Sequence, residues 1–399
     1  MLRSIVICLS LLATLQAQTL ERIISHSLET HNSLKAIEMR LSGFDESLSL
    51  TQNFQNPTLS LNVGDIQFED PLNRSVEPMQ FTSINVKQKI PYFGKRDASY
   101  RLLKSKKDVM LNSLEAVKVL LVKEIKLTAY TIWEYEEKLA IVNEHIELTR
   151  KNIELSSVYS SSGDSSHMEA MTMRLLLSQL KIKREKIKTK LEALYSRISY
   201  LSFSEITSLE VDVDVGEPKS LNLYKEKLQN NKTYQTKLAE VDEKNSLVKV
   251  KELDSAIDPF ISVGYFRREV NPDYMNLSVG ASLPIYGSES LNEQLARKEV
   301  LESTHNSNDF YEQLRAELKN AHAQLRNKYK TYIIIKNESI PEVEHMFELT
   351  TSMLKSGNNL LLYTNILEKR LELYEQKISV MASYKRDLSD IQALLGEIK

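Results

Sequence analysis

The chain carries one order of sequence signals twice, about 200 residues apart along its 399 residues. Each copy has two short alternating runs, then a Pro-x-x-Gly motif, then two long heptad-patterned stretches joined by a Gly-containing turn. Pro91 and Pro284 open the two motifs, 193 positions apart, and Gly163 and Gly357 mark the two turns, 194 positions apart. The near-constant shift predicts an internal two-fold repeat, each half a β-hairpin followed by a long helical hairpin.

Four alternating apolar and polar runs predict four strands. They cover residues 59–63 and 82–90 in the first half, and 261–265 and 275–283 in the second. Strands of about 8–10 residues cross a bilayer when tilted. Four strands cannot close a barrel, and open edges in lipid would leave backbone groups unpaired. We therefore expect several copies to share one barrel, and three copies would give twelve strands, which is within the known range.

Polar side chains alternate with the apolar ones in the second of these runs. Asn85, Lys87 and Lys89 fall between Ile84, Val86 and Ile90. In a membrane barrel such residues face the water-filled lumen. The alternative is the solvated face of a soluble hairpin.

The long stretches show coiled-coil periodicity. Apolar residues seven positions apart predict a buried seam along each helix. The first helix is predicted from Lys95 to Ser160, roughly 100 Å at 1.5 Å per residue. Apolar residues also lie off the seam, which favours neighbours on two sides, as in a closed ring of helices. The seam residues of the first helix and of its return helix are Ile125, Ile132, Leu139, Ile146 and Ile153, then Met173, Leu180, Ile187, Leu194 and Leu201.

Other segments are predicted from local signals. Residues 20–54 read as one helix, which Asn56-Pro57 ends. Residues 211–215 read as a short strand and residues 221–256 as helical. Pro341 is expected to kink its helix, with Ile340 as the bend point.

The N-terminus reads as a signal peptide at residues 1–17. Arg3 precedes an apolar run, and Ala17 is a small residue suited to cleavage. Cleavage would remove Cys8, the only cysteine, so no disulfide or thiol chemistry is expected. The expected domains are the first repeat at residues 18–201, a linker or equatorial segment at 202–255, and the second repeat at 256–399.

The sequence contains no constellation typical of an enzyme. It has no phosphate-binding Gly-rich loop, no nucleophile elbow and no His-Glu-x-x-His, so we expect neither catalysis nor a cofactor. The net charge of −2 favours no nucleic-acid partner. His167, Met168 and Met171 are candidates for a soft metal ion, against the simpler interpretation that they pack at a helix end.

The two Gly turns are predicted to end the helical hairpins at the same end of the molecule. Each turn carries residues typical of helix termini and tight turns. In a single helical hairpin they would be plain loops, but two copies at matching positions favour a shared role in contacting a partner. The turn residues are Gly163, Asp164 and Ser165, with Gly357, Asn358 and Asn359.

With these residues in place, the chain resembles the TolC-type outer-membrane efflux proteins over nearly all of its length. The resemblance is carried by Asn56-Pro57, Asp258-Pro259, the two Pro-x-x-Gly motifs, Pro341 sixteen residues before Gly357, and the two turns. It implies a mainly helical homotrimer with a twelve-stranded β-barrel in the bacterial outer membrane and a twelve-helix α-barrel in the periplasm. It also implies a periplasmic adaptor at the turns and an inner-membrane transporter, such as an RND-type pump, that supplies the energy.

The resemblance also bears on substrate and gate. Gly94-Lys95-Arg96 resembles the strand exit of the heavy-metal efflux branch, which favours metal cations. Family members often carry acidic residues after the second turn, whereas residues 360–366 here have none. The candidate gate residues are Glu169, six residues after Gly163, and Tyr363, six residues after Gly357. The alternatives are a type I protein secretion channel and a soluble periplasmic coiled-coil adaptor.

Overall fold

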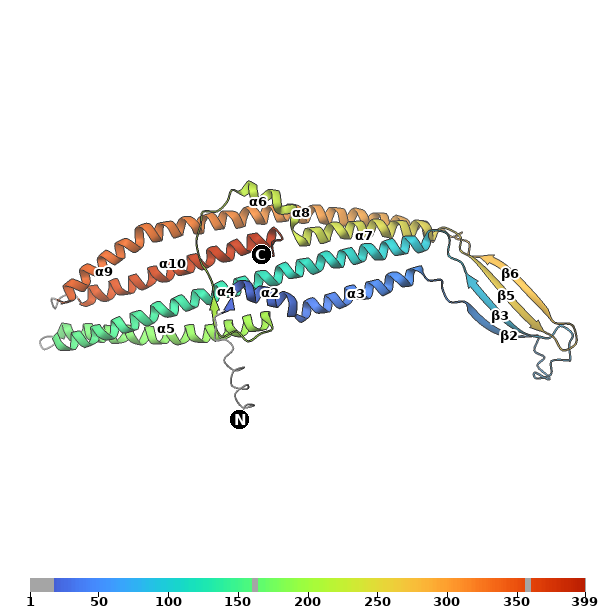
Figure 1. Cartoon of the computed structure of the whole chain (residues 1–399), viewed down its shortest axis with the longest axis horizontal. Helices are drawn as coiled ribbons and strands as arrows, with labels where there is room; N and C mark the ends of the chain where they lie inside the picture. The colour runs from blue at the N-terminus through green and yellow to red at the C-terminus, as the bar shows by residue number, and fades with distance from the viewer. Residues whose placement is uncertain (1–17, 160–163, 356–359, 399) are drawn as a thin grey trace, which may run out of the picture. The chain divides into compact units, whose positions relative to one another are not determined.

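The computed structural model describes residues 18–159, 164–355 and 360–398 (Figure 1). Contacts divide the chain into two compact units. Unit 1 comprises Met1–Lys35, Glu115–Lys232 and Glu312–Lys399, and unit 2 comprises Ala36–Leu114 and Thr233–Tyr311. Each unit therefore draws on both halves of the sequence. The boundaries of the expected domains, including the signal peptide outside the described residues, stay predictions.

Unit 2 contains a four-stranded antiparallel sheet with the order β2-β3-β5-β6 (Figure 1). The strands are β2 (Thr58–Gly64), β3 (Phe81–Lys89), β5 (Pro259–Arg267) and β6 (Tyr274–Ala281). The four predicted strands are confirmed to within two residues at every end. The helices α3 (Asn32–Gln52) and α7 (Lys232–Asp254) lie mostly in this unit, together with the first parts of α4 and α8.

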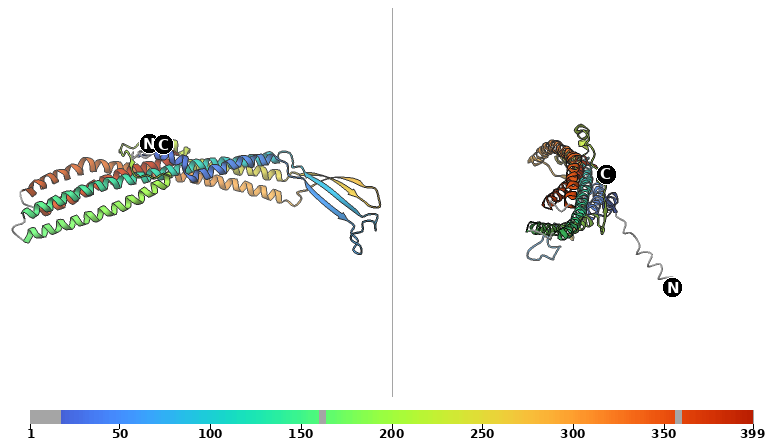
Figure 2. Two further views of the ribbon diagram at one scale, coloured as in Figure 1. Left: turned by 60° about the horizontal axis from the view of Figure 1, so that its bottom comes forward. Right: turned by 90° about the vertical axis from the view of Figure 1, so that its left-hand side faces the viewer.

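The long helices follow the heptad prediction. In α4, Ile125 and Ile132 are fully buried, and all five seam residues predicted for the return helix are buried in α5. In unit 1, α9 and α10 run side by side (Figure 2). The predominantly helical fold with a small β part is thereby confirmed. These helices are α4 (Lys95–Tyr159), α5 (Asp164–Ser202), α8 (Ser288–Ile334), α9 (Ile340–Lys355) and α10 (Leu360–Leu394).

The prediction of one helix over residues 20–54 is wrong. The chain forms α2 (Leu20–Thr30) and α3, and it leaves helical geometry at His31, whose ψ is 120°. The His31 ring packs edge-on against Phe203 with 4.8 Å between ring centroids, and its Nδ1 bonds the Ser33 hydroxyl at 2.7 Å. This side chain caps the start of α3, which local periodicity alone does not show.

The strand predicted at residues 211–215 is also wrong. The nearest strand, β4 (Leu209–Glu210), pairs in parallel with β1 (Gln18–Thr19), and residues 211–220 form no regular element. The partner strand β1 is only two residues long. The alternating apolar and polar residues after residue 210 therefore have no neighbouring strand to pair with. The predicted helical stretch that follows is divided into α6 (Leu221–Lys227), the 3-10 turn η1 (Leu228–Asn230) and α7.

Pro341 disturbs its helix one turn earlier than predicted. Ile340 has ordinary helical torsions, and the π-helical turn η2 spans Ile335–Ser339. Proline has no N–H to offer the carbonyl four residues earlier, and a wider turn accommodates that loss. None of the helices in the described part of the chain combines the length and apolarity that crossing a membrane requires.

Candidate functional site

One face of the sheet in unit 2 is apolar and exposed. The register aligns Leu59, Val86, Val263 and Leu277 in one row across the four strands. Leu277 is 70% exposed, and apolar residues at alternate positions of all four strands are likewise exposed. An exposed apolar patch of this kind marks a surface that contacts a membrane or another protein. The face consists of Leu59, Leu61, Val63, Ile84, Val86, Ile261, Val263, Tyr265, Met275, Leu277 and Val279.

The opposite face is mainly polar and holds the predicted lumen residues, together with the aromatic rings of Phe81, Phe260, Phe266 and Tyr274. Asn85 aligns with Ser60, Gly264 and Asn276 across the sheet, and its side-chain amide donates to the Ser83 hydroxyl at 3.0 Å. Lys87 places its ammonium 3.7 Å from the centroid of the Phe260 ring. Lys89 pairs with Asp258 at 3.4 Å, at the end of the sheet. Asn85, Lys87 and Lys89 therefore share one face; that this face lines a lumen stays a prediction.

The two Pro-x-x-Gly motifs end strands and begin helices. Gly94 and Gly287 have φ angles of +95° and +79°, which residues with a Cβ rarely adopt. The Gly94 carbonyl accepts a hydrogen bond from the Ala98 amide at 2.8 Å, which starts α4. These positions require glycine because the chain must reverse between strand and helix in a left-handed conformation.

Most of the predicted turn residues cannot be placed. Gly163, Gly357, Asn358 and Asn359 lie outside the described residues. For Asp164, Ser165, His167 and Glu169 only the helix α5 that carries them is described. Their role in adaptor contact and the gate role of Glu169 stay predictions.

No contact of a described residue supports the candidate soft-metal site at the start of α5. Met168 and Met171 are exposed. Within residues 18–159, 164–355 and 360–398, no group of three or more His, Cys, Asp or Glu is placed to hold a metal ion. The candidate site of His167, Met168 and Met171 stays a hypothesis.

Tyr363, the second gate candidate, is a packed residue. It is 2% exposed, its ring centroid lies 5.6 Å from that of Phe347 in α9, and Asn152 of α4 lies near its hydroxyl. Burial raises the pKa of its phenol. The side chain therefore contributes to packing among α4, α9 and α10, and any gating by Tyr363 would act through the packing of these helices.

Arg370 joins the same three helices and was not singled out by the sequence. Its Nε donates to Glu344 of α9 at 2.7 Å, and its Nη1 donates to Glu144 of α4 at 3.1 Å. Its guanidinium also lies 4.8 Å from the centroid of the Phe347 ring. In the sequence Arg370 is simply a cation three residues after the apolar Leu367, and this spacing does not reveal its partners.

Replacing Arg370 by methionine is expected to destabilise unit 1 by about 2 kcal/mol, because two charge-assisted hydrogen bonds are lost. Thermal unfolding followed by circular dichroism measures the change. Arg184→Met serves as the control, since Arg184 pairs with the adjacent Glu185 and with no other acidic residue in the described part of the chain. Equal melting temperatures for the two variants would contradict the role given to Arg370.

The chain resembles known proteins in structure. No protein-family model matches the chain, and no curated protein matches it. The Campylobacter jejuni CmeC outer membrane channel superposes with a TM-score of 0.76 at 16% identity, covering 94% of this chain and 85% of that chain. The chain has the fold of an outer-membrane channel.

Two further structures show the same channel fold. The open-state Neisseria gonorrhoeae MtrE outer membrane channel has a TM-score of 0.76 at 13% identity, covering 95% of this chain and 89% of that one. The Vibrio cholerae outer membrane protein VceC has a TM-score of 0.77 at 13% identity, covering 95% and 97%. The resemblance to TolC-type proteins seen in the sequence is therefore confirmed at the level of the fold.

Proposed function

We propose that this chain is a subunit of a TolC-type export channel of the bacterial outer membrane, and that three copies surround one passive conduit. The observation that carries the proposal is the sheet with one exposed apolar face and one polar face. In a membrane barrel the apolar face contacts lipid and the polar face lines the water-filled interior.

The edges of the sheet support assembly by strand pairing. Successive strands in the order β2-β3-β5-β6 are antiparallel, so β2 and β6 run in opposite directions. The β6 edge of one copy can therefore pair in antiparallel fashion with the β2 edge of the next. Such head-to-tail contacts generate a closed ring when the rotation from one subunit to the next adds up to a full turn. Lipid favours the closed ring because unpaired backbone N–H and C=O groups cost free energy in the hydrocarbon region.

Energy and partners follow from the resemblance. The chain has no nucleotide-binding motif, so an inner-membrane transporter such as an RND-type pump would supply the energy. A periplasmic adaptor would bind at the helix turns and favour an open state of the helices by its differential affinity for that state.

The substrate rests on one motif. The Gly94-Lys95-Arg96 stretch favours metal cations by resemblance, and a type I secretion channel is the alternative. In the structure, Lys95 pairs with Asp258 at 2.9 Å, and Arg96 donates to the Gln52 carbonyl at 2.7 Å. Both cations therefore stabilise the junction between strands and helices.

The experiment that tests the channel proposal is the mass of the protein extracted from outer membranes in mild detergent, corrected for bound detergent. A trimer is the expected result, because the four strands of one chain need neighbours. A monomer that stays in solution without detergent would contradict the channel and favour the coiled-coil adaptor.

The gate proposal has its own test. Replacing Glu169 by alanine is expected to raise single-channel conductance or weaken block by cations, because a ring of carboxylates would be lost. Planar-bilayer recordings measure both quantities, with the exposed Glu192→Ala as the control. Conductance and block equal to those of the wild type would count against Glu169.

A further inference from the structure

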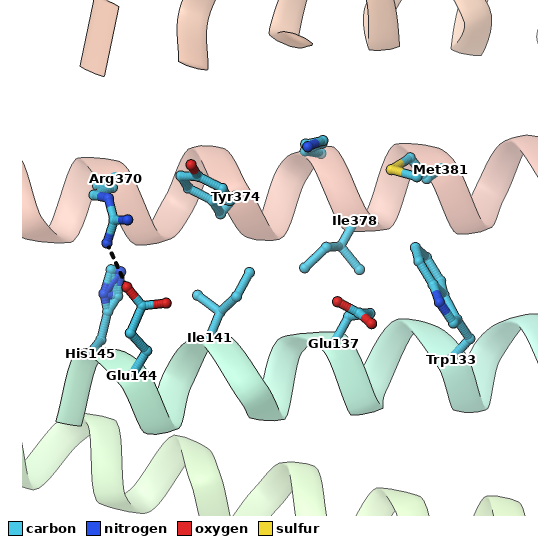
Figure 3. A pocket seen from close by; sticks show the side chains of 10 residues that line it. Trp133, Glu137, Ile141, Glu144, His145, Arg370, Tyr374, Ile378 and Met381 are labelled. Atoms are coloured by element: carbon cyan, nitrogen blue, oxygen red, sulfur yellow. Dashed lines mark hydrogen bonds and ion pairs between the residues drawn. The ribbon is translucent and has the colours of Figure 1, made fainter. Parts of the chain in front are cut away.

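A cavity of about 330 Å³ lies between α4 and α10 in unit 1 (Figure 3). His145 lies at one end of it beside Arg370, and Trp133 lies at the other end opposite Met381. Ile141 and Ile378 line the stretch between these ends, together with Tyr374 and Glu137. The volume is within the range of cavities that hold small organic molecules.

The His145 side chain is buried at its end of the cavity. The side chain is 1% exposed, and neither ring nitrogen has a partner among the described residues. Burial, with the nearby Arg370 charge, lowers the pKa of His145 to about 4, so the ring is neutral at pH 7. A neutral imidazole offers one donor and one acceptor, and a buried polar group without partners is costly. This end therefore fits an uncharged group that both donates and accepts, such as a hydroxyl or an amide.

The other end carries an exposed carboxylate, Glu137, and an aromatic ring, Trp133. Glu137 follows Trp133 by four residues, on the same face of α4, and forms no ion pair within the described part of the chain. No described cation lies over the Trp133 ring, whereas Arg370 and Lys377 lie 5.2 Å and 6.0 Å from the centroid of the Tyr374 ring on α10. A carboxylate next to an indole face is a favourable place for an organic cation.

The charges around the cavity favour the same ligand. Glu137 and Glu144 line it together with Arg370 and Lys377, and Arg370 also holds Glu344. The lining carboxylates and cations are therefore equal in number, but Glu144 is engaged by Arg370, and Lys377 lies over the Tyr374 ring. Glu137 is the lining carboxylate that pairs with no described cation, so a monocation finds a partner there that an anion does not.

We propose that this cavity is a binding site for an elongated amphipathic organic cation. Its ammonium would lie at Glu137 and Trp133, and its hydroxyl or amide would lie at His145. Ile141, Ile378 and Met381 would contact the apolar chain between the two ends. The proposal does not depend on the number of copies in the channel.

The test uses two probes of equal length and opposite charge, 8-amino-1-octanol and 8-hydroxyoctanoate, with the full-length protein in lipid nanodiscs. Trp133 is the only tryptophan of the chain, so its fluorescence reports on this cavity alone. The amino alcohol is expected to quench Trp133 with a Kd at least tenfold lower than that of the hydroxy acid. Glu137→Gln is expected to raise this Kd about tenfold, and His145→Phe to raise it severalfold.

Glu192→Gln is the matched control, because it removes an exposed carboxylate on α5 outside the cavity. Circular dichroism confirms that each variant is folded, and calorimetric titration measures binding independently of fluorescence. Equal affinity for the two probes would overturn the proposal even without a variant. An unchanged Kd in Glu137→Gln, or no binding of either probe up to its solubility limit, would also overturn it and leave the cavity to water. None of these outcomes bears on the trimer mass, so the channel proposal is tested separately.

Discussion

Replacing Leu277 by lysine is expected to abolish assembly of the channel in the outer membrane. Leu277 lies in the middle of β6 on the exposed apolar face. A lysine facing lipid at the bilayer midplane costs about 2–4 kcal/mol, and a ring of copies carries that cost once per subunit. The amount of folded, membrane-integrated protein in outer-membrane fractions measures the effect.

Ser278→Lys is the matched control for this prediction. Ser278 is the next residue of β6 and is also exposed, but it lies on the polar face. The same charge at this position is expected to be tolerated, because it would face water. If both variants assemble equally well, the apolar face does not contact lipid, and the proposed function loses its main support.

Lowering the pH from 7 to 4 is expected to destabilise unit 1 through His145. The pKa of His145 is about 4 in the folded protein, against an ordinary value of 6.5. Above pH 6.5 both the folded and the unfolded state hold the neutral ring, so the group has no effect on stability. As the pH falls below 6.5, the unfolded state binds a proton that the folded state excludes, and stability decreases until about pH 4. The full loss is about 3 kcal/mol per subunit.

Urea unfolding at several pH values measures this loss. A His145→Phe variant is expected to lose about 3 kcal/mol less than the wild type between pH 7 and 4, since it has no ring to protonate. His305→Phe is the control, because His305 is exposed. A wild-type pH profile that matches that of His145→Phe would show that His145 is not the group responsible.

Periodicity in the sequence predicted the elements that repeat one local rule over many residues. The seam through Ile125 and Ile132 and the alternation through Leu59 and Leu61 both appear where expected, because burial on one side imposes a period of seven or two. The positive φ of Gly94 likewise follows from the tight turn in which it lies. These features depend on neighbours within a few residues.

Features that depend on distant partners were missed. The break at His31 depends on Phe203, and the helix contacts of Arg370 depend on Glu144 and Glu344. That His145 finds no hydrogen-bond partner among the described residues likewise depends on which side chains of α10 face α4. Heptad positions do not specify which residues meet across two helices, so the cavity could not be found from the sequence.

The opposed edges β2 and β6 have a genetic consequence. On the proposed function, each subunit completes its sheet only through both neighbours, so one defective chain impairs every ring that it enters. A Leu277→Lys chain co-expressed with the wild type should therefore be dominant negative, and export should fall more steeply than the share of mutant chains. A decline in simple proportion to that share would instead indicate subunits that act independently.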